Sequence, residues 1–343
     1  MSGRARGLWP VLQRIGLWAA SVPYGWAAGL RNWMYDRAWN RLHRAAVPVI
    51  SIGNLTLGGT GKTPCVEYAA RFFRTLELRV AILSRGYGGQ GGRNDEALVL
   101  ERNLPDVPHL QGPDRALLAD IAVEELESEV LILDDGFQHR QLARDLDLVL
   151  VDASRPWGHG HLFPRGLLRE PPRSLRRAGM VLLTRADQVD EAKRRRIIGD
   201  IARHAPGVSV AESVHRPAEW VNSEGQSAPL DMVRQQPAAA FCGIGNPDAF
   251  RHTLQSLGAG VAAFREFPDH HPYARADVDD LRAWARRQPE SAVVVTTQKD
   301  LVKVGVPQLG GRPLWALRIE LSVEVGEEML QRKLKEAIRE QRS

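Results

Sequence analysis

Residues 47–64 read VPVISIGNLTLGGTGKTP. The first half of this stretch is an apolar run typical of a buried strand, and its second half is a glycine-rich loop that ends in Lys62-Thr63. Apolar residues at helical spacing follow the loop. Strand, glycine-rich loop, Lys-Thr and helix together predict a phosphate-binding loop, in which backbone N–H groups and a helix N-terminus face the phosphates of a nucleotide.

This loop predicts roles for individual residues. We expect Lys62 to reach the β- and γ-phosphates and Thr63 to ligate Mg²⁺. The usual first glycine of the motif is replaced by Thr56, and a glycine-rich turn that happens to carry a lysine stays as the alternative. The predicted nucleotide-binding residues are Thr56, Leu57, Gly58, Gly59, Thr60, Gly61, Lys62 and Thr63.

A second motif, LILDDGFQH at residues 131–139, places two acidic residues at the end of another apolar run. Because the carboxyl ends of parallel strands meet at one edge of a sheet, we expect Asp134 and Asp135 beside the phosphate loop, where a Mg²⁺ ligand is needed. One of them is expected to hold the metal or its water, and the other to face the reacting phosphate. The alternative is a turn rich in Asp and Gly.

Short apolar runs alternate with helix-length segments beyond residue 47, which is typical of a parallel sheet covered on both faces. The predicted fold class is therefore α/β and P-loop NTPase-like, with a mostly parallel sheet covered by helices, a second smaller α/β domain and an N-terminal amphipathic helical arm. Strands are expected at 47–52, 79–83, 130–133, 146–151, 180–183, 238–242, 261–264, 292–296 and 314–319, and a charged helix near 327–341. The expected domains are an arm at 1–46 (part of the first domain), a P-loop domain at 47–220, a polar hinge at 221–237 and a smaller α/β domain at 238–343.

Composition narrows the class of protein. The 343 residues are 43% hydrophobic and 25% charged, which suits packed cores and excludes wholesale disorder. Cys65 and Cys242 are the two cysteines, so neither a disulfide framework nor a cysteine-based zinc cluster is expected, and a reducing compartment is the default. The net charge of +5 is concentrated at the N-terminus, so it is poor evidence for a nucleic-acid partner, and none is expected.

Residues 1–46 are both basic and aromatic. They hold seven arginines against one aspartate and five of the nine tryptophans. The longest uncharged stretch, 15–30, is interrupted by glycines and a proline and is shorter than the about 20 apolar residues of a membrane-spanning helix. Tryptophan and arginine together favour a helix that lies at a membrane surface. A helical pair packed on the first domain is the alternative.

Residues 184–187 read TRAD after an apolar run and vaguely resemble the guanine-reading [NT]-K-x-D motif, although Arg185 replaces its lysine. A P-loop GTPase or metal-insertion NTPase recruited to a membrane therefore stays as an alternative. A membrane-recruited nucleotide-binding module without catalytic activity is a further alternative.

Five motifs in order carry a family resemblance: TLGGTGKT at 56–63, SRGYG at 84–88, DDGFQH at 134–139, PRGLLREP at 164–171 and FPDHH at 267–271. With residues 297–300, they resemble the tetraacyldisaccharide 4′-kinases of Gram-negative bacteria over nearly the whole chain. The resemblance implies ATP and Mg²⁺ as cofactors. It also implies transfer of the ATP γ-phosphoryl group to the 4′-hydroxyl of an acylated glucosamine disaccharide 1-phosphate, which gives lipid IVA for lipid A biosynthesis. The implied location is the cytoplasmic leaflet of the bacterial inner membrane.

The resemblance also implies roles for residues. Asp95 lies where the family has Gly-Asp-Glu-Pro, here Asn94-Asp-Glu-Ala97, and is expected to act as base on the acceptor hydroxyl. His270 is expected to support Asp95 from the second domain. The implied catalytic residues are Asp95, His270, Lys62 and Arg169, the metal ligands Thr63, Asp134, Asp135 and Glu170, and the substrate residues Ser84, Arg85, Tyr87, Arg115 and His139.

Overall fold

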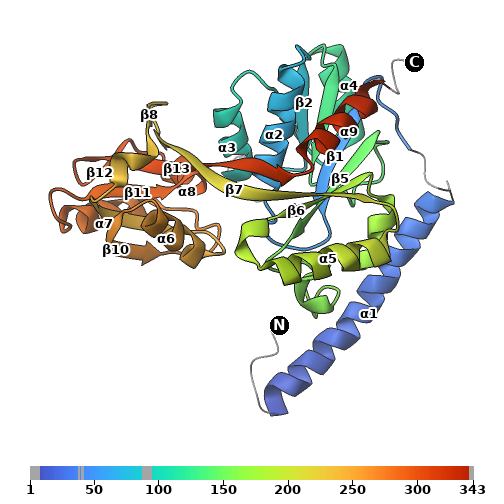
Figure 1. Ribbon diagram of the computed structural model, residues 1–343, viewed down its shortest axis with the longest axis horizontal. Helices are drawn as coiled ribbons and strands as arrows, with labels where there is room; N and C mark the ends of the chain where they lie inside the picture. The colour runs from blue at the N-terminus through green and yellow to red at the C-terminus, as the bar shows by residue number, and fades with distance from the viewer. Residues whose placement is uncertain (1–7, 38, 40–41, 87–94, 340–343) are drawn as a thin grey trace. The chain divides into compact units, whose positions relative to one another are not determined.

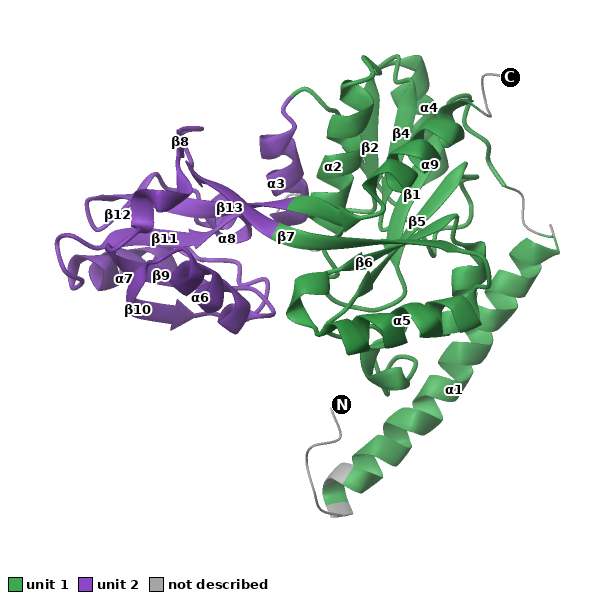
Figure 2. Cartoon of the chain, in the orientation of Figure 1, with its two compact units in different colours: residues 1–86, 106–215, 321–343 green, residues 87–105, 216–320 purple. Residues whose placement is uncertain are grey.

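The computed structural model describes residues 8–37, 39, 42–86 and 95–339. The chain forms two compact units (Figure 2). Unit 1 comprises residues 1–86, 106–215 and 321–343, and unit 2 comprises residues 87–105 and 216–320. Each unit is therefore assembled from segments that are far apart in the sequence.

Unit 1 is built on a parallel sheet with the strand order β7-β6-β5-β1-β4-β2-β3 (Figure 1). Its central strands are buried along their whole length, which explains their continuous apolar sequences. The strands of unit 1 are β1 Val49–Asn54, β2 Val80–Ser84, β3 His109–Gln111, β4 Val130–Asp134, β5 Leu146–Asp152, β6 Met180–Thr184 and the start of β7 Ser209–Asn222. Its helices are α1 Leu8–Asp36, α2 Lys62–Arg74, α4 Arg115–Glu124, α5 Glu191–His204 and α9 Glu327–Arg339, with 3₁₀ turns η2 Gly158–Gly160, η3 Pro172–Arg177 and η4 Ala186–Gln188.

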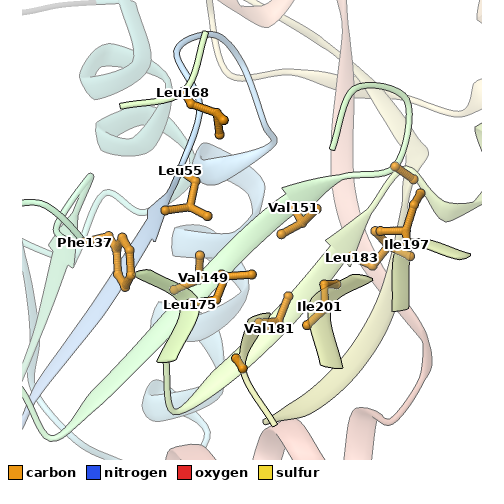
Figure 3. Close-up of a cluster of buried hydrophobic side chains, with 12 residues drawn as sticks. Leu55, Phe137, Val149, Val151, Leu168, Leu175, Val181, Leu183, Ile197 and Ile201 are labelled. Carbon is orange, nitrogen blue, oxygen red and sulfur yellow. The ribbon is translucent and has the colours of Figure 1, made fainter. Parts of the chain in front are cut away.

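One face of this sheet forms a hydrophobic core around β5 and β6 (Figure 3). Val149 and Val181 from these strands pack in one cluster with Ile197 and Ile201 of α5. Ile197 and Ile201 are four residues apart, so they lie on the same side of the helix. Leu55, which directly follows β1, belongs to the same cluster, so the start of the phosphate loop packs against this core.

Unit 2 is a smaller α/β unit in which β10, β9, β11 and β13 pair in that order and in parallel. The helix α3 belongs to this unit, where it packs on α8. The strands are the end of β7, β8 Ser227–Ala228, β9 Pro237–Cys242, β10 Gly260–Glu266, β11 Val293–Thr297, β12 Gln308–Leu309 and most of β13 Arg312–Val325. The helices are α3 Asp95–Asn103, α6 Pro247–Ser256, α7 Arg275–Arg286 and α8 Gln298–Val304, with the 3₁₀ turn η5 Leu230–Val233.

The fold class is as predicted, but the domain boundaries differ from the expected ones. The chain passes between the units within β7 and β13, and residues 321–343 belong to unit 1 although the C-terminal domain was expected to hold them. The polar stretch expected as a hinge is ordered in unit 2, where the Asn222 carboxamide accepts the N–H groups of Glu224 and Gln226. The polar residues of this stretch therefore form the turn of a hairpin between β7 and β8.

Helix α1 has two different faces. On one face, the Tyr24 ring packs edge-on against Phe163, and Asn32 donates to Glu170 at 2.8 Å. On the other, apolar side chains follow one another at steps of three or four residues and lie exposed. These are Trp9, Leu12, Ile15, Trp18, Val22, Trp26, Leu30 and Trp33, which we call the exposed stripe. No helix within the described residues combines the length and the apolar character needed to cross a membrane.

A substitution tests the contact between β1 and the loop after β4. A Cβ at Gly53 would lie 2.6 Å from the backbone nitrogen of Phe137, so Gly53→Ala forces the buried loop to move. We expect it to lower the free energy of unfolding by about 1–3 kcal/mol, as overpacking does. Urea unfolding measures this.

Gly199→Ala on α5 is the matched control, because a Cβ there meets nothing within 4 Å. It should raise the free energy of unfolding by up to about 1 kcal/mol through helix propensity. Equal stability of the Gly53→Ala protein and the parent would contradict the close packing.

Candidate active site

The phosphate loop is held in a conformation that needs glycine. Gly58 and Gly61 have φ values of +107° and +89°, which side chains with a Cβ rarely adopt. Gly61 caps α2, so the helix begins at Lys62. The first N–H groups of the helix have no partner within it and face the space that the loop surrounds. The Thr184 hydroxyl donates to the Thr60 carbonyl at 2.9 Å and ties the loop to the end of β6. The local structure is therefore a preformed anion site.

Lys62 lies in a polar cluster at the carboxyl ends of β1 and β4. Its Nζ is 3.3 Å from Asn54 Oδ1 and 3.4 Å from Asp135 Oδ1. Arg169 Nη1 donates to both Asp135 oxygens at 2.9 and 2.7 Å. Burial alone would raise the pKa of Asp135, but Lys62 and Arg169 outweigh it and hold that pKa below its usual value. Asp135 is thus an ionised group that orients the two cations.

Asp134 lies next to this cluster, at the last position of β4 and opposite Ile52 of β1. Its side chain is nearly buried, as is that of Thr63 on the first turn of α2. The pKa of the Cys65 thiol is raised by burial and further by the charge of Asp134. Carboxylate and hydroxyl oxygens are ligands that Mg²⁺ accepts, so Asp134 and Thr63 fit the predicted metal.

Glu170 has a different environment from the one expected of a metal ligand. Its side chain is fully buried, and its oxygens lie 2.8 Å from Asn32 Nδ2, 2.9 Å from Arg177 Nη2 and 3.5 Å from Arg31 Nη2. Within the described residues, no three His, Cys, Asp or Glu side chains gather as a metal cluster. Glu170 therefore joins α1 to η3 through these nitrogen partners, and its assignment as a metal ligand stays a prediction.

A basic cavity of about 250 Å³ adjoins this region of unit 1. Arg115 is nearly buried and donates from Nη1 to His139 Nδ1 at 3.2 Å. Burial, and then the charge of Arg115, lower the pKa of His139 to about 4, so its imidazole is neutral near pH 7. The cavity is lined by Arg31, Tyr35, Arg85, Pro113, Arg115, Gln138, His139, Arg140 and Gln141. Its four arginines make it a site for an anion.

Unit 2 carries a second cluster of charged side chains, around Asp95. His270 Nδ1 lies 3.0 Å from Asp95 Oδ2, and Lys303 Nζ lies 3.6 Å from the same oxygen. Lys299 pairs at 2.6 Å with Glu96, the neighbour of Asp95 on α3. Burial would raise the pKa of Asp95, but the hydrogen bond with His270 and the charges of Lys299, His270 and Lys303 lower it to about 2. The hydrogen bond to Asp95 in turn raises the pKa of His270.

The structure brings together most of the predicted site residues within each unit. The phosphate loop, Asp134, Asp135 and Arg169 meet in unit 1, where Arg85, Arg115 and His139 line the cavity. Ser84 is buried and hydrogen-bonds His109 at 2.8 Å, and Tyr87 lies outside the described residues. No role is predicted from the sequence for Asn54, Arg31, Arg140, Lys299 and Lys303. A signal existed for the last two, which are four residues apart and so share a face of α8.

Comparisons with known proteins agree on one family. The family model for tetraacyldisaccharide-1-P 4′-kinase matches residues 13–339. A tetraacyldisaccharide 4′-kinase of Anaeromyxobacter dehalogenans is 42% identical over 332 residues, covering 91% of this chain and 87% of the relative. One from Syntrophus aciditrophicus is 39% identical, covering 86% and 85%. The crystal structure of an "apo" form of LpxK from Aquifex aeolicus in complex with ATP has a TM-score of 0.77 and 31% identity, covering 95% of this chain and 99% of that one.

Proposed function

This chain belongs to the tetraacyldisaccharide-1-phosphate 4′-kinase family and is an ATP-dependent lipid A 4′-kinase, and we propose the roles of its residues in that reaction. The γ-phosphoryl group of ATP passes to the 4′-hydroxyl of a tetraacylated glucosamine disaccharide 1-phosphate, which gives lipid IVA. The observation that carries the proposed roles is the buried Asp95 carboxylate, hydrogen-bonded by His270 at 3.0 Å. Family membership decides against a GTPase, a metal-insertion NTPase or a non-catalytic module.

Unit 1 supplies the groups that hold the donor. The N–H groups of the loop and the Lys62 ammonium neutralise the β- and γ-phosphates, while Asn54 and Asp135 keep the ammonium in place. Thr63 and Asp134 are the proposed ligands of Mg²⁺, which the family implies. When bound, Mg²⁺ offsets charge on the β- and γ-phosphates.

Unit 2 supplies the base. The 4′-oxygen of the sugar forms a bond to phosphorus, the bond from phosphorus to the ADP oxygen breaks, and the hydroxyl proton passes to Asp95. A carboxylate with a pKa of about 2 is a weak base for a free hydroxyl. The transition state of phosphoryl transfer is loose, so the proton leaves late, and alignment by Asp95 matters more than basicity. His270 is hydrogen-bonded to Asp95 Oδ2, so its imidazole takes up part of the change in charge on Asp95.

The basic cavity of unit 1 is proposed to bind a phosphate or sugar oxygens of the acceptor. Its arginines suit a phosphate because guanidinium groups form bidentate hydrogen bonds with phosphate oxygens. Arg115 and Arg85 were predicted from the family resemblance, and Arg31 and Tyr35 add α1 to the same cavity. The helix that carries the exposed stripe therefore also contributes to recognition of the headgroup.

The exposed stripe is proposed to hold the protein on the cytoplasmic leaflet of the inner membrane, where an acylated substrate lies. A stripe of indole and aliphatic side chains opposite the docked face of α1 matches the boundary between headgroups and acyl chains. Arg14 and Arg37 lie on the same helix and its end, and they favour anionic lipid.

The first kinetic prediction concerns Lys62. Lys62→Ala removes the charge that neutralises the phosphates, so turnover should fall by about 10³-fold in a folded protein. A coupled ADP-release assay measures this. Lys193→Ala, at an exposed position of α5, is the control and should keep parental turnover. A folded Lys62→Ala enzyme with near-parental turnover would refute the proposed donor site.

The second kinetic prediction concerns the base. Asp95→Asn keeps the shape of the side chain and removes proton acceptance, so kcat should fall by about 10²–10⁴-fold with little change in the KM for ATP. His270→Ala should add little further loss in the double variant, because the two side chains act as a unit. Asp248→Asn, at an exposed position in the first turn of α6, is the control. Full activity of both single variants would refute the assignment.

Vesicle binding tests the role of the exposed stripe. Replacing Trp18, Trp26 and Trp33 together by Ser should abolish most co-sedimentation with anionic vesicles and leave ATP binding unchanged. High salt should weaken the parent's binding without abolishing it, because screening removes the contribution of about 1 kcal/mol per basic residue and leaves the apolar one.

The matched control replaces Leu117, Leu126 and Val325 by Ser. These apolar side chains are also exposed but lie on α4, at the turn after it and at the end of β13. This control should sediment like the parent. Sedimentation of the tryptophan variant at the parental level would show that the stripe is not the membrane contact.

A further inference from the structure

We propose that Lys303 is a positioning residue for the Asp95–His270 pair, and that its buried ammonium fixes the Asp95 carboxylate and sets the proton affinity of the pair. The inference deepens the proposed function, because it rests on Asp95 as the base. It concerns described residues of unit 2 alone.

Lys303 lies between two carboxylates. Its Nζ is 3.6 Å from Asp95 Oδ2 and 3.5 Å from Asp300 Oδ1. The exposed fractions of the three side chains are 12% for Lys303, 8% for Asp95 and 0% for Asp300, so little water screens these charges. Two carboxylates this deep in the protein need a cation nearby, and the ammonium serves both.

Asp300 is held rigidly, which gives the ammonium a fixed position. Its Oδ1 accepts the Tyr273 hydroxyl at 3.0 Å and the backbone N–H of Gly243 at 3.1 Å. Its Oδ2 accepts the Thr297 hydroxyl at 2.6 Å. The Tyr273 ring lies 5.5 Å from Lys303 Nζ and covers the ammonium from another side. The hydrogen bonds of Asp300 thus fix its carboxylate, which holds the Lys303 ammonium in place. The ammonium in turn holds the Asp95 carboxylate.

Lys303 also selects the oxygen of Asp95 that is available for chemistry. Oδ2 contacts both His270 Nδ1 and Lys303 Nζ, whereas Oδ1 accepts the backbone N–H of Glu96 at 3.1 Å. An oxygen that faces two cationic groups is the poorer proton acceptor of the two. Oδ1 is thus the oxygen that receives the proton of the acceptor hydroxyl.

The two groups on Oδ2 differ in exposure. The His270 side chain is 59% exposed, whereas that of Lys303 is 12% exposed. Water therefore screens the contact of Asp95 with Lys303 less than its contact with His270. The other charged groups at the pair are Glu96 on α3, Lys299 and Asp300 on α8, and Asp269 beside His270, at 3.9 Å.

Removing a positive charge from this cluster raises the pKa of both members of the pair, because protonation no longer meets its repulsion. The pKa of His270 should therefore rise in Lys303→Met, and the limb of the kcat–pH profile that reports His270 should move to higher pH by the same amount. A residue that acted through packing alone would move neither.

The experiment compares Lys303→Met, Lys303→Gln and Lys303→Arg in the full chain. The His270 imidazole is titrated by NMR, with His270→Ala to assign its signal, and kcat and KM are measured against pH. We expect a rise of about one unit in the His270 pKa and a fall of about 10–10²-fold in kcat for the Met and Gln variants. The KM for ATP should stay within about twofold. Lys303→Arg, which keeps the charge, should restore most of kcat and the parental pKa.

The matched control is Lys333→Met, a lysine on α9 that pairs with Glu336 at 3.2 Å and should change none of these values. Lys303→Gln retains hydrogen-bond donors for both carboxylates, so it decides the matter if Lys303→Met does not fold. An unchanged His270 pKa in a folded neutral variant overturns the inference, as does an Arg variant as impaired as Gln. The titration involves no turnover, so it stands even if Asp95→Asn proves active, a result that would overturn only the proposed base.

Discussion

The pairing of β1 with β4 is the constraint on which the nucleotide site depends. Register places Ile52 opposite Asp134, so the loop that leaves β1 and the acids that end β4 emerge side by side. Lys62 then contacts Asp135 Oδ1, and Arg169 donates to both oxygens of the same carboxylate. The loop after β4 packs closely on β1, because Phe137 leaves no room for a side chain at Gly53. Charge neutralisation at the phosphates thus follows from how two buried strands pair.

Buried carboxylates organise the rest of the molecule, because each one needs a cation or several hydrogen-bond donors. Glu170 attaches α1 through Asn32 and Arg31, so the exposed stripe and the basic cavity belong to one unit. In unit 2, Asp300 holds Lys303, and Lys303 holds Asp95. Ionic contacts therefore position the proposed catalytic and binding side chains. The hydrophobic cores fix the strands from which these side chains extend.

The sequence was sufficient to predict the phosphate loop, the acids of β4 and the parallel sheet, because each depends on local pattern and on strand order. It also indicated Asp95 and His270, through the family resemblance. It could not reveal that Glu170 is enclosed by α1 and η3, or that residues 95–103 pack on α8, because such contacts join segments far apart in the chain. The two units differ from the expected domain boundaries for the same reason. Two long strands, β7 and β13, run from one unit into the other, and the sequence pattern of a strand does not indicate where it changes unit.

The reaction of this enzyme is phosphoryl transfer to one hydroxyl of an acylated disaccharide. To test it, the protein is incubated with γ-labelled ATP, Mg²⁺ and tetraacyldisaccharide 1-phosphate, the lipid is separated by chromatography, and the product is examined by phosphorus–proton correlation NMR. We expect a labelled lipid with a new phosphomonoester coupled to the proton at carbon 4′. Release of the label as inorganic phosphate, or a phosphate on any other carbon, would contradict it.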